Sequence, residues 1–442
     1  MALSIERYLE RGPATSKEIQ AETGLSQAGV SRQIGLLGDR IIKMRVGRSY
    51  RYALTCNAFG GDDRLPVCMV DAHGNTVAAA ILRPLAHGGF FVEPLIGAPE
   101  VLLGEGGIGL YDDLPYFLSD LRPQGFLGRQ IAEELSASTE FPADPRNWTS
   151  SHVGRYLVSN GEDLPGNLKF GQQALSRVRR KPEVTTVQDY PVLADGVMSG
   201  IIPDSSAGGE QPKFTAYCGE RLAHVIVKFS PKADNEVTRR WRDILITEYH
   251  AIEAIQSEGF PAADTRIFEA DGRIFLESER FDRCGEYGRM PMISLQAVDA
   301  EFTGLGSDWQ KVIVALYHKN LVSWQHVFDA VSLWYFGRLI NNTDMHLGNL
   351  SLGIEGKVFR LLPVYDMCSM GFVPKSGDVP QFDFVNSESL LEDAIFTPSV
   401  FIEDGAKGTI LRMARKFWND VASDQRISEE FSEFLSNSDL LS

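Results

Sequence analysis

The first 55 residues alternate short apolar repeats of helical period with polar or glycine-rich breaks. Ile5 and Leu9 fall on one helical face, and Gly12 begins the first break. The pattern predicts three helices and then two strands, at residues 3–11, 16–24, 27–38, 41–46 and 49–54. Three helices followed by a hairpin are typical of a winged helix-turn-helix domain, which we assign to residues 1–56.

The pattern changes after this head. Residues 56–64 are rich in glycine and acids, which predicts a linker. Apolar and polar positions then alternate up to residue 110, which predicts mainly β-structure. A helical period follows Gly125, residues 153–171 carry strand and turn signals, and residues 172–198 are predicted to be extended. We therefore expect a β-rich subdomain at residues 65–198.

The second half predicts strands first and helices afterwards. A strand around Lys228 is followed by a helical pattern that contains Glu248, and another strand covers residues 273–283. These elements define a predicted unit at residues 199–285, and a mostly helical unit follows at residues 286–442. Single cores rarely grow beyond ~250–300 residues, so a chain of 442 residues agrees with several domains.

Charge is distributed unevenly between these parts. The formal net charge is −16, which favours solubility and argues against a protein that coats nucleic acid. Residues 1–55, in contrast, hold nine Lys or Arg and only five Asp or Glu. A small basic head therefore precedes a strongly acidic body.

The head carries polar side chains where a helix-turn-helix domain meets DNA. The segment AETGLSQAGVSRQIGLL is similar to the helix-turn-helix of bacterial transcription regulators. The candidate DNA-binding residues are Ser26, Gln27, Ser31, Arg32 and Arg48. The helix residues would meet base edges, and the arginine of the wing would meet phosphates. The sequence predicts DNA as a partner, with dimerisation or protein contacts as the alternative use of such a head.

Cysteine usage and hydropathy favour a cytoplasmic protein. The five cysteines are scattered and form no CxxC pair, so neither a disulfide framework nor a zinc ribbon is indicated. A signal peptide has an apolar run behind basic residues, and the start of the chain shows no such run. Apolar runs stay well below the ~20 residues of a membrane helix, and no membrane partner is expected.

The segment Ser205–Lys213 has the composition of a phosphate-binding loop. Glycines let backbone N–H groups approach phosphates, and Lys213 adds a positive charge. The segment lacks the GKS or GKT ending of a Walker A motif. On its own it indicates little, because glycine-rich turns are common.

The strongest chemical signal is Asp344-Met-His-Leu-Gly-Asn349, which follows an apolar helix. Protein kinases place a catalytic Asp and a magnesium-binding Asn at this interval. Asp366 ends an apolar strand seventeen residues after Asn349, where kinases place their second metal ligand. Asp344 would accept the proton of an attacking hydroxyl, and Asn349 and Asp366 would hold Mg²⁺. Helix, motif, strand, glycine turn, strand and Asp together predict an α+β, two-lobed protein-kinase-like fold.

Upstream residues fit the same scheme. Lys228 is the one charge in an apolar strand, and such a lysine binds ATP phosphates when a helix glutamate, here Glu248, holds it. The end of the next strand, Glu279 to Phe281, would form the hinge that meets adenine. His346 follows the catalytic Asp instead of preceding it, an order shared with phosphoinositide kinases and the HipA family.

Eight segments in order resemble the HipA family of bacterial toxin kinases, and in particular its YjjJ-like members with an N-terminal helix-turn-helix. They lie between residues 65 and 425: LPYFLSDLRPQGFLGRQIA, GEDLPGNLKF, SAGGEQPKF, HVIVKFSP, TEYHAIEAI, ERFDR, NNTDMHLGNLSL and LLPVYDM. The resemblance implies a serine/threonine protein kinase with ATP and Mg²⁺ as cofactors. It implies that ATP is bound by Gly208, Gly209, Glu210, Gln211, Lys213, Lys228, Glu279, Phe281, His346, Asn349, Tyr365 and Asp366.

The resemblance also implies an off-switch. In the family a serine at the head of the glycine loop is autophosphorylated and the loop is then ejected. Ser206 matches that position, and Ser205 is the adjacent candidate. A doubly negative phosphoserine would be repelled from a site for ATP phosphates.

Partners and alternatives stay open at this stage. Family toxins usually work with a separate helix-turn-helix antitoxin, but here such a module is fused to the chain. The fusion would make the protein self-regulating, make it less toxic, or remove the need for a partner. Some members phosphorylate aminoacyl-tRNA synthetases, so a protein of translation is the expected kind of substrate. The alternatives are a nucleotide-sensing transcription regulator and a small-molecule or lipid kinase.

Overall fold

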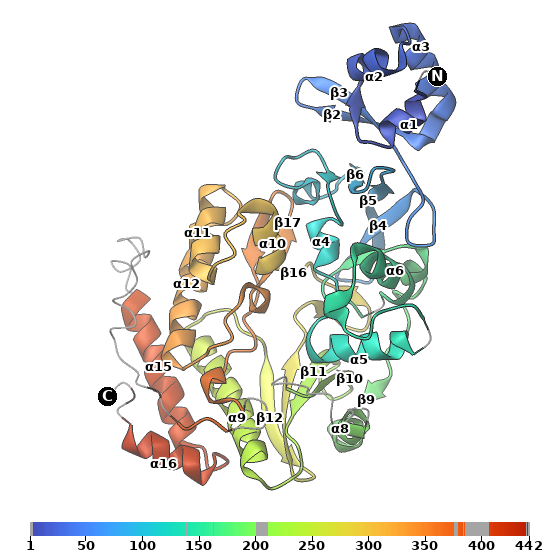
Figure 1. Ribbon diagram of the computed structural model, residues 1–442. Helices are drawn as coiled ribbons and strands as arrows, with labels where there is room; N and C mark the ends of the chain where they lie inside the picture. Colours follow the sequence, from blue (N-terminus) through green and yellow to red (C-terminus); the bar gives the residue numbers. More distant parts are fainter. Residues whose placement is uncertain are drawn as a thin grey trace.

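The computed structural model places a small head at one end of a larger body (Figure 1). It describes residues 3–440 except for 138, 162, 200–210, 375–378, 383, 385–405 and 439. The body contains a β-rich middle region, a second sheet with one long helix, and a helical part that carries the C-terminus.

The head combines three helices with a small sheet. Its elements are α1 (Ile5–Leu9), β1 (Ala14–Thr15), α2 (Ser16–Thr23), α3 (Gln27–Leu37), β2 (Ile41–Val46) and β3 (Ser49–Leu54), with strand order β1-β3-β2. Thr15 and Glu18 form a capping box at the start of α2, and Gly24 ends that helix at φ 72°. The predicted helices and strands are confirmed, with α1 shorter than expected. The assignment as a winged helix-turn-helix domain stays a prediction.

The head docks on the middle region through its β-hairpin. Ile42, Met44 and Ala53 pack with Leu85 and Phe91 in one buried cluster. The backbone continues this contact, because the amide of residue 86 donates to the carbonyl of residue 54 at 2.8 Å. Head and body therefore share both a core and a β-bridge.

The middle region is an antiparallel sheet accompanied by helices. It contains β4 (Leu65–Val70), β5 (Thr76–Pro84), β6 (Phe90–Pro94), β7 (Leu110–Tyr111), α4 (Tyr116–Ser119), α5 (Gly125–Ser136), α6 (Ser150–Asn160) and β8 (Leu168–Phe170), with strand order β7-β6-β5-β4-β8. The strand and turn prediction for residues 153–171 is wrong in its first half, which is α6. Val153, Tyr156 and Leu157 are buried at helical spacing, and a capping box at Thr149 starts the helix before the predicted segment.

The second sheet has the order β12-β13-β11-β10-β9. This part contains α7 (Gln172–Ser176), β9 (Val184–Thr185), α8 (Tyr190–Ser199), β10 (Lys213–Cys218), β11 (Ala223–Phe229), α9 (Glu236–Ser257), β12 (Thr265–Ala270), β13 (Arg273–Glu279), β14 (Arg283–Cys284) and β15 (Gly288–Arg289). The extended prediction for residues 172–198 is wrong, because α7 and α8 lie there. Only Tyr190 and Ala194 of α8 are fully buried, whereas Val192 is 74% exposed. Because the buried apolar stripe of α8 is so narrow, the helical periodicity in its sequence is weak.

The C-terminal part is mainly helical, as predicted. It contains β16 (Ile293–Ser294), α10 (Leu295–Phe302), α11 (Trp309–His318), α12 (Trp324–Leu339), β17 (Ser351–Glu355), β18 (Val358–Leu361), α15 (Ala406–Ser423) and α16 (Glu429–Asn437). Its small sheet has the order β16-β17-β18. Helix α15 packs against both α9 and α12. One hydrophobic core runs from the middle region into this part.

Candidate active site

Lys228 lies at the centre of the second sheet, on β11 between β10 and β13. Its Nζ donates to both carboxylate oxygens of Glu248 on α9, at 2.5 and 2.6 Å. It also donates to Oδ1 of Asp366 at 2.5 Å. The side chains of Lys228 and Glu248 are only 9% and 4% exposed. The lysine–glutamate pair expected from the sequence is therefore present, and Asp366 joins it.

The charges of this cluster do not cancel. Burial alone would lower the pKa of Lys228, but the carboxylates of Asp366 and Glu248 outweigh burial and hold that pKa above its ordinary value. Burial alone would raise the pKa of Asp366, but Lys228 and Lys213 lower it to about 2. One ammonium group thus sits between the buried carboxylate of Glu248 and the carboxylate of Asp366, which is 34% exposed. A further cation can bind on the exposed side of Asp366.

Asp366 is held in an unusual backbone conformation. Its φ is 54°, the left-handed region that non-glycine residues seldom occupy. Asn341, just before the catalytic loop, has φ 58°. Such conformations cost on the order of 1–3 kcal/mol each and concentrate at functional sites. They lie in the connections that follow α12 and β18.

The segment Asp344–Asn349 is a tight loop held by its own side chains. The Asn342 carboxamide accepts from the Asp344 amide at 3.0 Å. The Nδ2 of Asn349 donates to the Asp344 carbonyl at 2.7 Å and to its Oδ2 at 3.3 Å. His346 caps the short helix Leu347–Asn349, because its Nδ1 accepts from the Gly348 amide at 3.0 Å. The loop keeps Asp344 and Asn349 within contact of each other.

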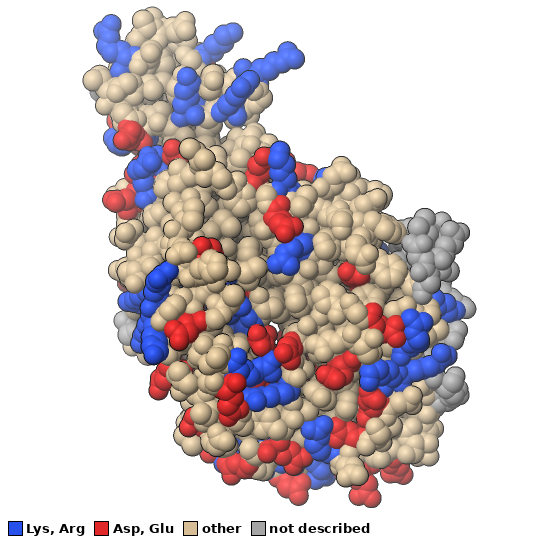
Figure 2. All heavy atoms as spheres, turned by 180° about the vertical axis from the view of Figure 1, so that it is seen from behind, with Lys and Arg blue, Asp and Glu red and all other residues tan. Residues whose placement is uncertain are grey.

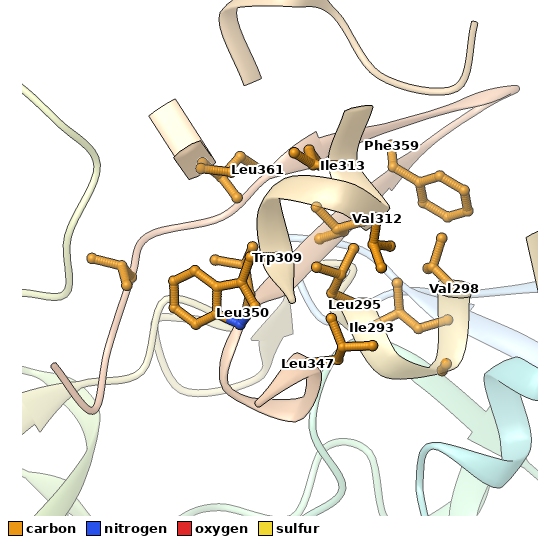
Figure 3. Close-up of a cluster of buried hydrophobic side chains, with 14 of the residues drawn as sticks. Ile293, Leu295, Val298, Trp309, Val312, Ile313, Leu347, Leu350, Phe359 and Leu361 are labelled. Atoms are coloured by element: carbon orange, nitrogen blue, oxygen red, sulfur yellow. The ribbon is translucent and has the colours of Figure 1, made fainter. Parts of the chain in front are cut away.

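A hydrophobic cluster fixes this loop to the C-terminal part (Figure 3). Leu347 and Leu350 flank Asn349 and are buried with side chains of α10, α11 and the small sheet. The indole Nε1 of Trp309 donates to the His346 carbonyl at 2.9 Å. Two leucines and one indole thus fix the position of the polar residues between them.

The polar residues of the Lys228 cluster and of the catalytic loop line one cavity of about 630 Å³. Of the predicted site residues, Gln211, Lys213, Lys228, Asp344, His346, Asn349 and Asp366 line it. Gly208, Gly209 and Glu210, with Ser205 and Ser206, lie outside the described residues. All predicted ATP-site and catalytic residues that the structure describes therefore line this cavity, except Glu279, Phe281 and Tyr365 near the hinge.

The hinge residues lie beside the cleft and do not line this cavity. The Glu279 amide donates to the Asp264 carbonyl and the Arg280 amide to the His224 carbonyl, at 2.8 and 2.9 Å. The Phe281 amide has no hydrogen-bond partner among the described residues. A free amide two residues after a strand end is what a hinge offers to adenine.

Tyr365 links the hinge to the catalytic loop. Its ring lies 5.8 Å from that of Phe281. Its hydroxyl bonds to the Ser351 hydroxyl at 2.7 Å and donates to the Gly348 carbonyl at 3.3 Å. Tyr365 therefore has a positioning contact with the loop, in addition to the ATP contact expected from the sequence.

Asn349 and Asp366 fit a magnesium ion by the chemistry of their oxygens. Because the amide nitrogen of Asn349 is used on Asp344, its Oδ1 is left as an acceptor. Asp366 brings an ionised carboxylate into a cluster with excess negative charge. Mg²⁺ prefers such hard oxygen ligands and completes its shell with water and phosphate oxygens. Among the described residues, no group of three His, Cys, Asp or Glu side chains forms a metal site.

Several lining residues escaped the sequence analysis. Gln124 and Gly125, at the start of α5, reach the cavity from the middle region, and Trp241 reaches it from α9. Cys368 lies beside Asp366 in sequence, and burial raises the pKa of its thiol. Gln124 and Gly125 lie in the first of the family-like segments, but no residue spacing marks any of these positions as part of a site, because they meet the cleft only through tertiary packing.

The candidate DNA-binding residues lie on the outer surface of the head. Gln27, Ser31 and Arg32 of α3 are exposed, and so is Arg48 on the hairpin. The Ser26 hydroxyl accepts from the Gly29 amide at 3.2 Å and so caps α3. Leu36, near the end of α3, is 81% exposed. These polar groups lie on the surface of one domain, and their binding to DNA stays a prediction.

Comparisons with known proteins agree with this architecture. Residues 61–179 match the family description "YjjJ-like toxin, middle domain", and residues 205–425 match "HipA-like C-terminal domain". Toxin YjjJ of Escherichia coli (strain K12) is 36% identical over 434 residues, which cover 96% of this chain and 93% of the relative.

Solved structures give the same result for the fold. A chain of the HipA, HipB and operator DNA complex from Shewanella oneidensis MR-1 aligns with a TM-score of 0.58 and 16% identity, over 85% of this chain and 96% of that chain. The Helicobacter pylori proinflammatory kinase CtkA aligns with a TM-score of 0.34, too low to add to this. The predicted two-lobed kinase-like fold is confirmed. No helix in the described part of the chain is long and apolar enough to cross a membrane.

Proposed function

Because this chain belongs to the HipA-like family of toxins, in the branch represented by toxin YjjJ, we propose that it is an ATP-dependent kinase of protein serine or threonine. One observation carries the proposal. The buried Lys228 pairs with Glu248 and Asp366, and Asp344 and Asn349 face the same cavity. This is the set of groups that kinases use to hold ATP and to orient a hydroxyl.

Each residue has a role that its contacts support. Lys228 and Lys213 bind the ATP phosphates, and Glu248 keeps Lys228 in place. Asn349 and Asp366 hold Mg²⁺, which when bound neutralises phosphate charge. Asp344 accepts the proton of the attacking hydroxyl. Its carboxylate is half exposed, so a substrate hydroxyl can reach it. The Phe281 amide and the Glu279 carbonyl receive adenine, and Gly208 to Gln211 cover the phosphates.

Autophosphorylation of Ser206 or Ser205 is the proposed off-switch. Both serines immediately precede the segment that leads to Gln211 and Lys213, which line the cavity. A phosphate group of charge about −2 would compete with ATP for the same lysines. The modified chain would therefore bind ATP less tightly.

The head is proposed to bind DNA. Figure 2 shows several lysine and arginine side chains projecting from it and few acids, while both signs are mixed over the visible face of the body. The related Shewanella protein was solved with HipB and its operator DNA. We propose that the fused head supplies this DNA contact here, so that a separate antitoxin is not required for it. The protein substrate is expected to be a protein of translation.

Phosphotransfer can be tested with the full-length protein, Mg²⁺ and labelled ATP. We expect self-labelling at Ser206 or Ser205 and labelling of lysate proteins, both abolished by Asp344→Gln. ATP affinity should change little in this variant, because Asp344 contacts the acceptor. Asp62→Asn, an exposed carboxylate of the 56–64 segment, is the matched control. A wild type that binds ATP but labels neither itself nor any lysate protein would favour a nucleotide-sensing regulator. Transfer only to small molecules or lipids would favour the other alternative.

DNA binding can be tested by the salt dependence of affinity for the DNA upstream of the gene. Arg32→Ala or Arg48→Ala should weaken binding and lower the slope of log affinity against log salt by about 1 per lost phosphate contact. Arg146→Ala removes an 87% exposed arginine from the body and should leave both unchanged. Absence of any binding at low salt would refute this part of the proposal.

A further inference from the structure

A second cavity opens beside Asp344. Its volume is about 600 Å³, and its walls include Trp334 and Arg338 from α12. It shares Thr343, Asp344 and His346 with the nucleotide cavity, but Lys228, Asn349 and Asp366 do not line it. Asp344 therefore stands at the boundary between two cavities.

The chemistry of phosphotransfer distinguishes the two sides. ATP phosphates belong with Lys228, Asn349 and Asp366, which line only the nucleotide cavity. The attacking hydroxyl must contact Asp344 and approach the γ-phosphate in line, opposite the leaving oxygen. The acceptor therefore has to arrive from the side of Asp344 that the metal and phosphate ligands do not occupy.

We propose that the second cavity binds the protein segment that carries the acceptor hydroxyl, and that Arg338 and Trp334 select segments with an acidic side chain close to it. This inference rests on the proposed phosphotransfer and adds its specificity. The acidic group would pair with the Arg338 guanidinium while the hydroxyl meets Asp344.

Arg338 has the properties of such a selector. It is exposed in the last turn of α12, and its guanidinium carbon lies 5.3 Å from the centre of the Trp334 ring. It forms no ion pair with any described residue, although the body is rich in carboxylates. A guanidinium held over an aromatic ring is oriented in advance and keeps its planar fork for a carboxylate. The proposed acceptor serines also have Asp204 next to them in sequence.

A cavity of about 950 Å³ between α4, α5 and α10 is the competing acceptor site. It meets the nucleotide cavity at Gln124 and Gly125, but Asp344 does not line it. Three arginines line it, Arg122, Arg129 and Arg146, and Arg146 is already paired with Asp144 at 2.7 Å. A base that does not face this cavity cannot activate a hydroxyl bound in it, so the smaller cavity is preferred.

The test uses full-length protein, Mg-ATP and a bacterial lysate whose own kinases have been inactivated. Newly phosphorylated sites and the rate of self-labelling are measured for wild type, Arg338→Glu, Arg338→Lys and Trp334→Ala. Arg146→Glu is the charge-matched control and probes the competing cavity. Because Arg338 is exposed, its variants are expected to fold, and Mg-ATP affinity within twofold of wild type verifies this.

We expect wild-type sites to be enriched in Asp or Glu at one fixed distance from the acceptor. Arg338→Glu should phosphorylate such sites about tenfold more slowly, a factor equal to ~1.4 kcal/mol, and should favour Lys or Arg at that distance. Arg338→Lys should keep the acidic preference in weaker form.

Three outcomes contradict the inference in distinguishable ways. A wild type that binds ATP but transfers phosphate to nothing overturns the proposed function and the inference with it. A wild type that transfers phosphate, with Arg338→Glu equal to it in rates and sites, overturns the inference alone. A preference that shifts with Arg146→Glu instead of Arg338→Glu assigns the acceptor to the larger cavity.

Discussion

At the scale of single residues, the candidate site is defined by charges that do not balance. Lys228 is bonded to the buried Glu248 and to the partly exposed Asp366, so this trio has one positive and two negative groups. A buried charge is tolerated only with a partner. Lys213 and a bound magnesium ion would supply the missing positive charge beside Asp366. Stability and ligand binding should therefore be linked through this cluster.

Lys228→Met is expected to destabilise the protein by about 3–5 kcal/mol near neutral pH, because it leaves the buried Glu248 and the partly exposed Asp366 without their cation. In the wild type the pKa of Asp366 is lowered to about 2. The stability that Asp366 contributes is therefore fully present above its ordinary pKa near 4 and is lost between about pH 4 and 2. In the variant the two carboxylates have lost this cation, so burial raises their pKa values and they bind protons at a higher pH than they do in the unfolded chain. The deficit should therefore shrink as the pH falls toward about 4.

Urea unfolding of both proteins between pH 4.5 and 8 measures this deficit. Lys232→Met is the control, because Lys232 pairs with Asp195 and Asp271 at the surface and should cost less than about 1 kcal/mol. Millimolar Mg²⁺ should restore part of the variant's stability. A deficit that is equal at all pH values would show that the carboxylates are not the cause.

The sequence predicted those site residues whose signal is local. Asp344 and Asn349 lie five positions apart, and Lys228 stands alone in an apolar strand, so spacing and contrast mark them. Gln124 and Arg338 carry no such signal. Gln124 reaches the cleft only because the middle region packs beside it, and Arg338 lines the cavity beside Asp344 only because α12 folds next to the catalytic loop.

At the scale of elements, the polar loop depends on the apolar residues within it. Leu347 and Leu350 stand on either side of Gly348 and Asn349 in the sequence, and both are part of the core shown in Figure 3. Their burial decides where Asn349 points. The error at α8 comes from how little of that helix is buried. A helix that buries a narrow stripe, as α8 does with Tyr190 and Ala194, shows little periodicity in sequence.

Leu350→Ala is expected to cost about 2–5 kcal/mol, since Leu350 is 1% exposed and leaves a cavity. The turnover number should fall more than the affinity for ATP, because the loss loosens Asn349 while Lys228 stays in place. Leu36→Ala, at an 81% exposed leucine, should change stability by less than about 0.5 kcal/mol. Denaturant unfolding and steady-state kinetics test both statements. An unchanged turnover number would show that the cluster does not position the loop.

At the scale of the whole molecule, the head is a docked part of the body. Arg83 of the middle region is 4% exposed in its side chain and pairs with the Asp63 carboxylate at 2.9 Å. It also donates to the carbonyls of Asp63 and Asp39, at 2.8 and 2.7 Å. The 56–64 segment, predicted as a linker, thus includes an anchored residue, and the head hairpin shares a core with the body. DNA bound at the head would restrain the whole kinase.

Arg83→Met is therefore expected to release the head without unfolding either part. Removal of one member of a buried ion pair costs about 3–5 kcal/mol, and here that loss falls on the docking contacts. Hydrogen exchange should rise in residues 39–64 and in β5, while the middle of α9 keeps its protection. Arg64→Met, which removes a 46% exposed arginine 3.9 Å from Glu93, should leave exchange unchanged. If head and body in Arg83→Met still exchange as the wild type does, the apolar cluster of the hairpin holds the head by itself. If α9 also loses protection, the head is part of the stability of the kinase and cannot be detached from it.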